Sequence, residues 1–81
     1  MFTVYVLHSE KHNKIYIGYS SNLSERLVSH NVLGNSWTSR FRPWSVVLSE
    51  SYATKEAALK REKSLKAGHG RKWIREFLIP K

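Results

Sequence analysis

Two polar residues recur at helical spacing beside apolar ones in the stretch 22–31 of the sequence. Leu23 and Leu27 mark the inward stripe of an expected helix, and Arg26 and His30 fall on the same face. An arginine and a histidine placed there can bind an anionic group such as a phosphate. The alternative is structural: the arginine extends to solvent, and the histidine is a hydrogen-bonded residue at the rim of the core.

A glutamate occupies the centre of the apolar face in a second expected helix, 55–67. Glu62 lies four residues after Ala58 and three before Leu65, which mark the inward stripe. Burying a carboxylate without a partner is costly, so such a residue is usually paired with a cation or bound to a metal ion. Two interpretations stay open: Glu62 is a metal ligand, or it forms an ion pair with Arg26.

Two tyrosines are expected on one face of a β-hairpin formed by the segments TVYVLH and IYIGY. If the turn centres near Glu10–Lys11, Tyr5 and Tyr16 lie opposite each other. Gly18 shares the face of Tyr16 and leaves room there for a ligand or a backbone. Two phenols, an arginine, a histidine and a carboxylate on one side of the sheet suit phosphoryl chemistry. The arginine would contact a phosphate oxygen, the carboxylate would hold a divalent ion, and a phenol would position or deprotonate water.

The elements that must position these groups are expected in the order β-β-α-β-α-α. Their ranges are 3–8, 15–19, 22–31, 44–50, 55–67 and 71–79. Asn22 and Thr54 are expected as helix N-caps, and Gly68 and Pro80 as the residues that end the last two helices. Residues 32–43 are expected to form a loop. The fold class is therefore α+β, with a three-stranded, mostly antiparallel sheet packed against helices.

Composition limits the functions that this chain can have. Its 81 residues are expected to form one domain, 1–81. All six acidic residues are glutamate, which excludes a two-metal site built on clustered aspartates and an EF-hand loop. Because cysteine is absent, disulfides and thiolate zinc sites are excluded as well. No apolar run is long enough for a transmembrane helix, no signal peptide is recognisable, and a cytoplasmic location is the expectation.

The net charge of +8 is concentrated toward the C-terminus, which favours a polyanionic partner, nucleic acid before a membrane surface. A solvated, lysine-rich helix face is the alternative. The segment NSWTSRFRPW interleaves aromatic side chains with Arg40 and Arg42, a combination that can stack on bases and hold phosphates. Trp44 is expected in the core. Further basic candidates for contact with nucleic acid are Lys66, Arg71, Lys72 and Arg75.

These residues together resemble the paired motif and the helices of the GIY-YIG nuclease superfamily. The matching positions are Val4-Tyr5, Tyr16-Ile17-Gly18, Arg26, His30, Arg42-Pro43-Trp44 and the stretch 57–62 (AALKRE). Short single-domain bacterial members are the most similar, and related domains begin one subunit of the excinuclease ABC of nucleotide excision repair and certain homing endonucleases. Thr3 stands where the family motif has glycine. The asparagine that many members carry near the end of the domain is missing, since the last one here is Asn35.

The resemblance implies a role for each matching residue. Glu62 would bind a single Mg²⁺ or Mn²⁺ ion, and Arg26 would contact the scissile phosphate. Tyr5 and Tyr16 would order the attacking water, one of them as general base, while His30 would assist or anchor the phosphate. The implied reaction is hydrolysis of a phosphodiester bond.

The implied function is a metal-dependent DNA endonuclease in repair or recombination, acting on branched or damaged DNA, with Gly18 letting the DNA backbone come close. One alternative is a nucleic-acid-binding module that retains the fold without turnover, and another is a basic protein that acts only through a protein partner. The inward Glu62 favours the enzyme, because a carboxylate repels phosphate unless a cation lies between them.

Overall fold

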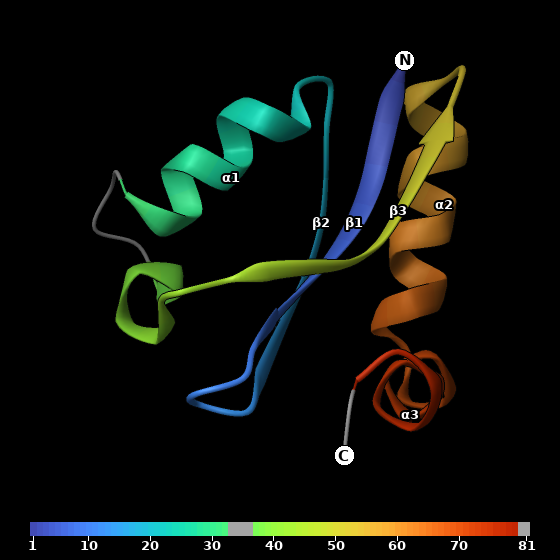
Figure 1. The fold of residues 1–81 in the computed structure, drawn as a ribbon. Coiled ribbons are helices and arrows are strands. Elements are labelled where there is room, and N and C mark those ends of the chain that lie inside the picture. Colours follow the sequence, from blue (N-terminus) through green and yellow to red (C-terminus); the bar gives the residue numbers. More distant parts are fainter. Residues whose placement is uncertain (33–36, 80–81) are drawn as a thin grey trace.

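The computed structural model describes residues 1–32 and 37–79. Its elements are β1 (Phe2–Ser9), β2 (Lys14–Ser20), α1 (Leu23–Asn31), a short 3₁₀ helix η1 (Trp37–Phe41), β3 (Ser45–Tyr52), α2 (Lys55–Lys66) and α3 (Gly68–Phe77) (Figure 1). The predicted order β-β-α-β-α-α is confirmed, and η1 lies within the segment expected as a loop. The expected end of the last helix at Pro80 falls outside the described residues, as does Asn35. Within the described ranges, no helix has the length and apolar character needed to cross a membrane.

The sheet has the order β2-β1-β3, and β1 pairs with both neighbours in antiparallel orientation. Tyr5 pairs with Gly18, and Leu7 pairs with Tyr16, so the expected pairing of Tyr5 with Tyr16 is wrong by two residues. The turn centres later than expected because Asn13 adopts a left-handed conformation, with φ of 52°. A shift of two residues preserves the face of every side chain, so both tyrosines still point to the same side.

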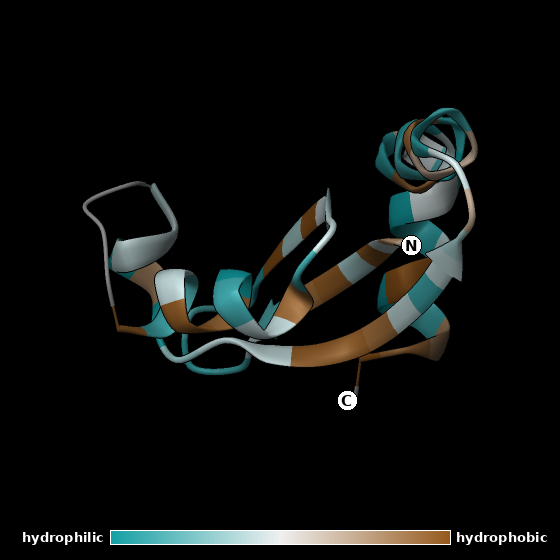
Figure 2. Cartoon of the chain, turned by 90° about the horizontal axis from the view of Figure 1, so that it is seen from above, coloured by the Kyte–Doolittle hydropathy of each residue, from teal (hydrophilic) through white to brown (hydrophobic). Residues whose placement is uncertain are grey.

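Helices cover both faces of the sheet. Figure 1 shows α1 on one side of the strands and α2 on the other. Side chains alternate along β1, so Tyr5 and Leu7 face α1 and η1, whereas Val4 and Val6 face α2 and α3. The second core is completed by Ile17, Ala58, Leu65 and Ile74. Figure 2 shows the same alternation as apolar and paler bands along the strands.

The two expected N-caps are confirmed. The Asn22 side chain accepts a hydrogen bond from the amide of Glu25 at 3.1 Å, and Thr54 Oγ1 accepts one from the amide of Ala57 at 3.2 Å. Each cap satisfies an amide that the first turn leaves without a partner. Local sequence therefore determines where α1 and α2 begin, and with them the positions of Arg26, His30 and Glu62.

The start of the third helix differs from the expectation. The prediction was 71–79 after a glycine-rich link, but α3 begins at Gly68, directly after the C-cap of α2. Gly70 is buried, and a Cβ there would overlap the carbonyl oxygen of Ser64 and lie 2.7 Å from Leu65 Cα. Glycine at this position thus permits close packing between two helices instead of ending one of them.

Candidate active site

Tyr5 and Tyr16 form the floor of the site. Their ring centroids are 6.2 Å apart, and the Tyr5 hydroxyl lies over Gly18 on the edge strand β2. A Cβ on Gly18 would lie 3.0 Å from the Tyr5 hydroxyl and 3.1 Å from Tyr16 Cε1. The room left by Gly18 is therefore filled by the two tyrosines, which corrects the expectation that a ligand or the DNA backbone uses it.

His30 connects this floor to α1. The side chain is only 7% exposed, and its Nε2 lies 3.2 Å from the Tyr5 hydroxyl. Its ring centroid is 4.7 Å from that of Tyr16. Burial, followed by the positive charges of Arg26 and Arg42, lowers the pKa of His30 below its usual 6.5. His30 is accordingly a neutral imidazole at neutral pH, able to accept a proton.

Arg26 is exposed on α1, as the structural alternative required, yet its charge acts on the buried groups. It lowers the pKa of both Tyr5 and His30. A guanidinium in this position remains accessible to a phosphate in solution while lying within electrostatic range of the tyrosine hydroxyl. Arg26 is therefore near enough to Tyr5 and His30 to influence their pKa values, and its place in the site stays a prediction.

Glu62 lies on α2, on the other side of the sheet from α1. The expectation that all five groups line one side is wrong, because α2 packs on the face opposite α1. The Glu62 side chain is 15% exposed, and its ion pair among the described residues is with Lys66 at 3.7 Å, not with Arg26. Its negative charge nevertheless raises the pKa of Tyr5. Glu62 and Arg26 thus both influence the pKa of Tyr5 electrostatically, although their helices lie on opposite faces of the sheet.

Four influences meet at the Tyr5 hydroxyl. Burial and the neighbouring Tyr16 raise its pKa, Arg26 lowers it, Glu62 raises it, and the result is about 12. Tyr5 therefore keeps its proton at neutral pH. A protonated phenol and a neutral imidazole can each donate or accept here, according to which ring nitrogen carries the proton, so this contact makes Tyr5 and His30 a coupled pair.

The segment after α1 contacts His30 on the ring nitrogen that faces away from Tyr5. The contacting residue, Thr38, was not predicted from the sequence. Thr38 on η1 places its Oγ1 2.9 Å from His30 Nδ1, and its carbonyl accepts a hydrogen bond from Trp44 Nε1 at 2.8 Å. Asn31 Oδ1 accepts a hydrogen bond from the amide of Trp44 at 2.6 Å. A threonine in an expected loop carries no signal of this kind, because the contact depends on how η1 folds back on α1.

Arg42 has a structural contact in place of the expected exposed position. Its Nε donates to the carbonyl of His30 at 2.6 Å, and its Nη2 donates to the carbonyl of Ser29 at 3.3 Å. A guanidinium at this end of a helix satisfies carbonyls that lack partners and complements the helix dipole. Arg42 therefore caps the end of α1, and its expected contact with nucleic acid stays a prediction.

Comparison with known proteins identifies the family. Residues 1–75 match the GIY-YIG catalytic domain. The chain belongs to the GIY-YIG family. This match confirms the superfamily expected from the sequence, and it agrees with the α+β fold and its antiparallel sheet. A catalytic-domain family of this kind indicates a nuclease, which is the level of function that the comparison supports.

Several relatives carry the name UPF0213 protein, which states no activity. A UPF0213 protein of Staphylococcus haemolyticus is 35% identical over 57 residues, which are 69% of this chain and 70% of the relative. A UPF0213 protein of Staphylococcus epidermidis is 40% identical over 53 residues, 64% of this chain and 65% of the relative. The structure-specific endonuclease subunit SLX1 of Podospora anserina is 40% identical over 76 residues, 85% of this chain but 22% of that protein.

The donor set fits the single divalent ion expected of this GIY-YIG domain. Within the described ranges, no three or more His, Cys, Asp or Glu residues gather into a metal site. Glu62 provides one largely buried carboxylate whose paired ammonium is 3.7 Å away. Mg²⁺ commonly takes one or two carboxylates from the protein and completes its shell with water and substrate phosphates. One carboxylate from the protein would therefore suffice for an ion whose other ligands are water and phosphate oxygens.

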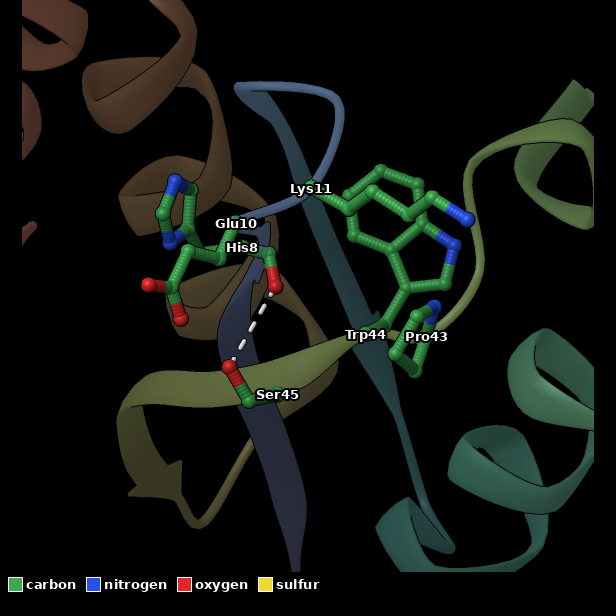
Figure 3. Close-up of a pocket in the computed structure, with 6 residues that line it drawn as sticks. All are labelled: His8, Glu10, Lys11, Pro43, Trp44 and Ser45. Atoms are coloured by element: carbon green, nitrogen blue, oxygen red, sulfur yellow. Dashed lines mark hydrogen bonds between the residues drawn. The ribbon is translucent and has the colours of Figure 1, made fainter.

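The candidate catalytic groups of this GIY-YIG domain lie outside the cavity drawn in Figure 3. That cavity has a volume of about 640 Å³ and is lined by His8, Glu10, Lys11, Pro43, Trp44 and Ser45. In Figure 3, His8 and Glu10 extend to one side of β1, and Lys11 and Trp44 extend to the other. The tyrosine pair, His30 and Glu62 are not among the residues that line this cavity.

The other expected nucleic-acid contacts are exposed, but several are also engaged within the fold. Arg40 and Lys72 are exposed. Lys66 pairs with Glu62, and Arg71 donates to the carbonyl of Lys66 at 2.9 Å. Arg75 donates to the Asn13 side chain at 3.1 Å. Arg40 and Lys72 therefore stay the clearest candidates for contact with a substrate.

The aromatic residues of the 37–44 segment divide as expected between core and surface. Trp44 is buried, which confirms its expected place. Trp37 is 49% exposed, and its ring centroid lies 6.0 Å from that of Trp44. Trp44 in turn contacts Tyr16, with centroids 6.4 Å apart, so the ring of Trp44 lies between the exposed indole and Tyr16.

Proposed function

We propose that this chain is a DNA endonuclease that hydrolyses phosphodiester bonds with one bound Mg²⁺ or Mn²⁺ ion. The observation that carries the proposal is the environment of the Tyr5 hydroxyl. This hydroxyl contacts the neutral His30, and the charges of Arg26 and Glu62 both change its pKa. A structural role alone does not require a guanidinium, an imidazole and a carboxylate all to influence one buried phenol.

The proton relay follows from the two pKa shifts. Tyr5, with a pKa of about 12, is not a phenolate at neutral pH, so it cannot be the final proton acceptor. In the relay, water attacks phosphorus and gives its proton to the Tyr5 oxygen, while the Tyr5 proton passes to His30 Nε2. The bond from phosphorus to the leaving oxygen breaks, and this oxygen takes a proton from solvent. Arg26 stabilises the negative charge that develops on the phosphate oxygens.

Glu62 is the residue that would hold the ion. When bound, a divalent ion supplies positive charge that offsets the charge on the phosphate in the transition state. Without an ion, Glu62 would repel the substrate that Arg26 attracts. Lys66 already pairs with Glu62, so its ammonium would be displaced or would turn toward the phosphate backbone.

DNA would approach the edge strand from the side of α1 and η1. Trp37 offers an exposed ring for base stacking, and Arg40 on the same short helix offers charge for phosphates, whereas Lys72 lies on α3, on the opposite face of the sheet. The net charge of +8 supplies the sequence-independent part of the affinity. One relative is by name a structure-specific endonuclease subunit, which supports branched DNA as the substrate. A repair role like that of the excinuclease stays a prediction.

The direct test uses supercoiled plasmid and labelled flap, splayed-arm and four-way DNA, each with Mg²⁺, Mn²⁺ or EDTA. Glu62→Gln keeps the size of the side chain and removes its charge, and Glu56→Gln is the matched control on the exposed face of α2. We expect metal-dependent cleavage by the natural sequence and by Glu56→Gln. We expect about a hundredfold slower cleavage by Glu62→Gln, whose binding to DNA is retained. Cleavage that survives EDTA in both variants would overturn the one-metal mechanism.

A nucleic-acid-binding module without turnover is the second candidate. The ion pair of Glu62 with Lys66 favours it, because a carboxylate already paired can be structural. Binding to DNA without cleavage under every metal condition would select this function. A further sign would be tighter DNA binding by Glu62→Gln in EDTA, because that variant has lost a repulsive charge.

A further inference from the structure

Thr38 is held in one position by contacts from both its main chain and its side chain. It is 3% exposed, and its carbonyl accepts the indole N–H of Trp44 at 2.8 Å. Its hydroxyl lies 2.9 Å from His30 Nδ1. Trp44 is itself fixed by Asn31, whose side chain exchanges hydrogen bonds of 2.6 and 3.1 Å with the main chain of Trp44. The hydroxyl of Thr38 therefore meets His30 from a rigid support.

His30 stands between two hydroxyl groups and has one proton to share in its neutral form. Nδ1 faces Thr38, and Nε2 faces Tyr5 at 3.2 Å. A neutral imidazole donates from one nitrogen and accepts at the other. Either Tyr5 donates to Nε2 and Nδ1 donates to Thr38, or both hydrogen bonds have the opposite polarity. A phenol is a stronger acid than an aliphatic alcohol, so the favoured direction starts at Tyr5 and ends at the oxygen of Thr38.

We propose that Thr38 is a positioning residue: its hydroxyl accepts the Nδ1 proton of His30 and thereby fixes the tautomer whose Nε2 can take the proton of Tyr5. The proposal rests on the endonuclease function for its kinetic consequence, but not for the tautomer itself. Without the hydroxyl, the ring could turn or carry its proton on Nε2. In either case Tyr5 would lose its proton acceptor.

The test combines NMR with kinetics. Long-range ¹H–¹⁵N spectra of labelled protein distinguish the two neutral tautomers, and the His30 signals are assigned with His30→Gln. We expect the Nδ1–H tautomer in the natural sequence and in Thr38→Ser, which keeps a hydroxyl. Thr38→Val, which is similar in shape to threonine, should show a substantial share of the Nε2–H form. It should also lower kcat at least tenfold with little change in KM, and Thr38→Ser should restore most of the loss.

Each outcome decides a separate point. An Nε2–H tautomer in the natural sequence overturns the proposal even if Thr38→Val does not fold. So does a Thr38→Val protein that folds and keeps the Nδ1–H form, or one that changes tautomer with kcat unaltered. If no variant, including the natural sequence, cleaves DNA, the endonuclease function fails. The tautomer result then supports or overturns the assignment of the hydrogen bond on its own.

Discussion

The hydroxyl of Tyr5 lies 3.2 Å from Nε2 of His30, although the two residues are 25 positions apart in the sequence. Tyr5 belongs to the central strand β1 and His30 to the helix α1. Tyr5 is held in its protonated form, and His30 in its neutral form, by burial and by nearby charges. In these protonation states Tyr5 has a proton to give and His30 has a nitrogen that can accept one. The relationship explains why a chain with so few acidic groups can still offer a base at neutral pH.

The acidic limb of the pH–rate profile should depend on Arg42. His30 must be neutral to accept a proton, so activity falls as the pH drops through its lowered pKa. The groups that face or influence His30 are Tyr5, Tyr16, Arg26, Thr38 and Arg42. Arg42→Met removes one of the charges that lower this pKa, so the limb should move to higher pH. Kinetics between pH 5 and 8 would show it.

Arg42→Lys is the control for this shift. It keeps the positive charge and loses the two-pronged contact with the end of α1. Its acidic limb should stay close to that of the natural sequence, even though both variants lower the melting temperature. A limb that stays in place in Arg42→Met, or moves to lower pH, would show that His30 is not the group that titrates.

Gly18→Ala should impair catalysis more than folding. The new Cβ would lie 3.0 Å from the Tyr5 hydroxyl and 3.1 Å from Tyr16 Cε1, so both rings must shift by a few tenths of an ångström. Overpacking of this kind costs about 1 kcal/mol of stability. Displacing the relay should reduce kcat by about tenfold, because catalysis depends steeply on geometry. Thermal melting and single-turnover kinetics separate the two effects.

Gly68→Ala is the matched control, since a Cβ at this position meets nothing within 4 Å. It should leave kcat unchanged and raise stability slightly, because alanine favours a helix. If Gly18→Ala turned over at the rate of Gly68→Ala, the close contact above Gly18 would have no bearing on catalysis.

Local features of the sequence were enough to predict much of the fold. Asn22 and Thr54 act within one helical turn, so their capping could be predicted without tertiary information. The alternation along β1 likewise placed Tyr5 and Tyr16 on one face, because a hairpin shifted by two residues keeps every side chain on its side. The last helix was expected to begin only at residue 71, after Gly70, but Gly70 lies within α3 because it permits close packing of this helix against α2.

The site was harder to predict where it depends on distant contacts. Nothing in the spacing of Arg26 and Glu62 reveals that their helices lie on opposite faces of the sheet, because the crossover between them is set by tertiary packing. The sequence gives no indication of the contact between Thr38 and His30, because this contact follows from the folding of η1 against α1. It does not reveal the contact of Arg42 with the end of α1 either, since a basic residue between aromatic residues is equally suited to DNA and to the end of a helix.

Trp37→Ala should weaken binding to single-stranded or flapped DNA. The exposed ring packs against Trp44, which in turn contacts Tyr16, and stacking of a base on an aromatic side chain contributes about 1–3 kcal/mol. Fluorescence anisotropy with a labelled flap should show Kd rising about 5- to 150-fold. Phe77→Ala removes an exposed aromatic side chain on α3 and should leave Kd unchanged. Equal effects of the two variants would indicate a loss of general stability and no stacking.

Arg40→Gln should change the salt dependence of binding. If Arg40 contacts one phosphate, its removal should reduce the slope of log K against log salt concentration by about 1. The side chain is exposed, so the melting temperature should be almost unaffected. Titrations at several salt concentrations measure the slope. A slope that matches the natural sequence would place Arg40 away from the DNA.

Glu50→Gln should loosen the attachment of α2, which carries Glu62, to β3. The two carboxylate oxygens of Glu50 accept hydrogen bonds from Arg61 at 2.8 and 3.3 Å, and Tyr52 donates one at 2.9 Å. The hydrogen bond from Arg61 is the main cause that lowers the pKa of Glu50 below its usual 4.5. Because the pair is partly exposed, the expected loss of stability at pH 7 is about 1 kcal/mol.

The stability lost in Glu50→Gln should depend on pH. A carboxyl group whose pKa is lowered in the folded state contributes stability above pH 4.5, and the contribution disappears as the pH falls through the lowered pKa. The difference in melting temperature between the natural sequence and Glu50→Gln should therefore be largest at neutral pH and vanish in strong acid. Glu56→Gln, exposed on the same helix that Arg61 belongs to, should differ little at any pH. A constant difference down to strong acid would mean that Glu50 acts through packing instead of charge.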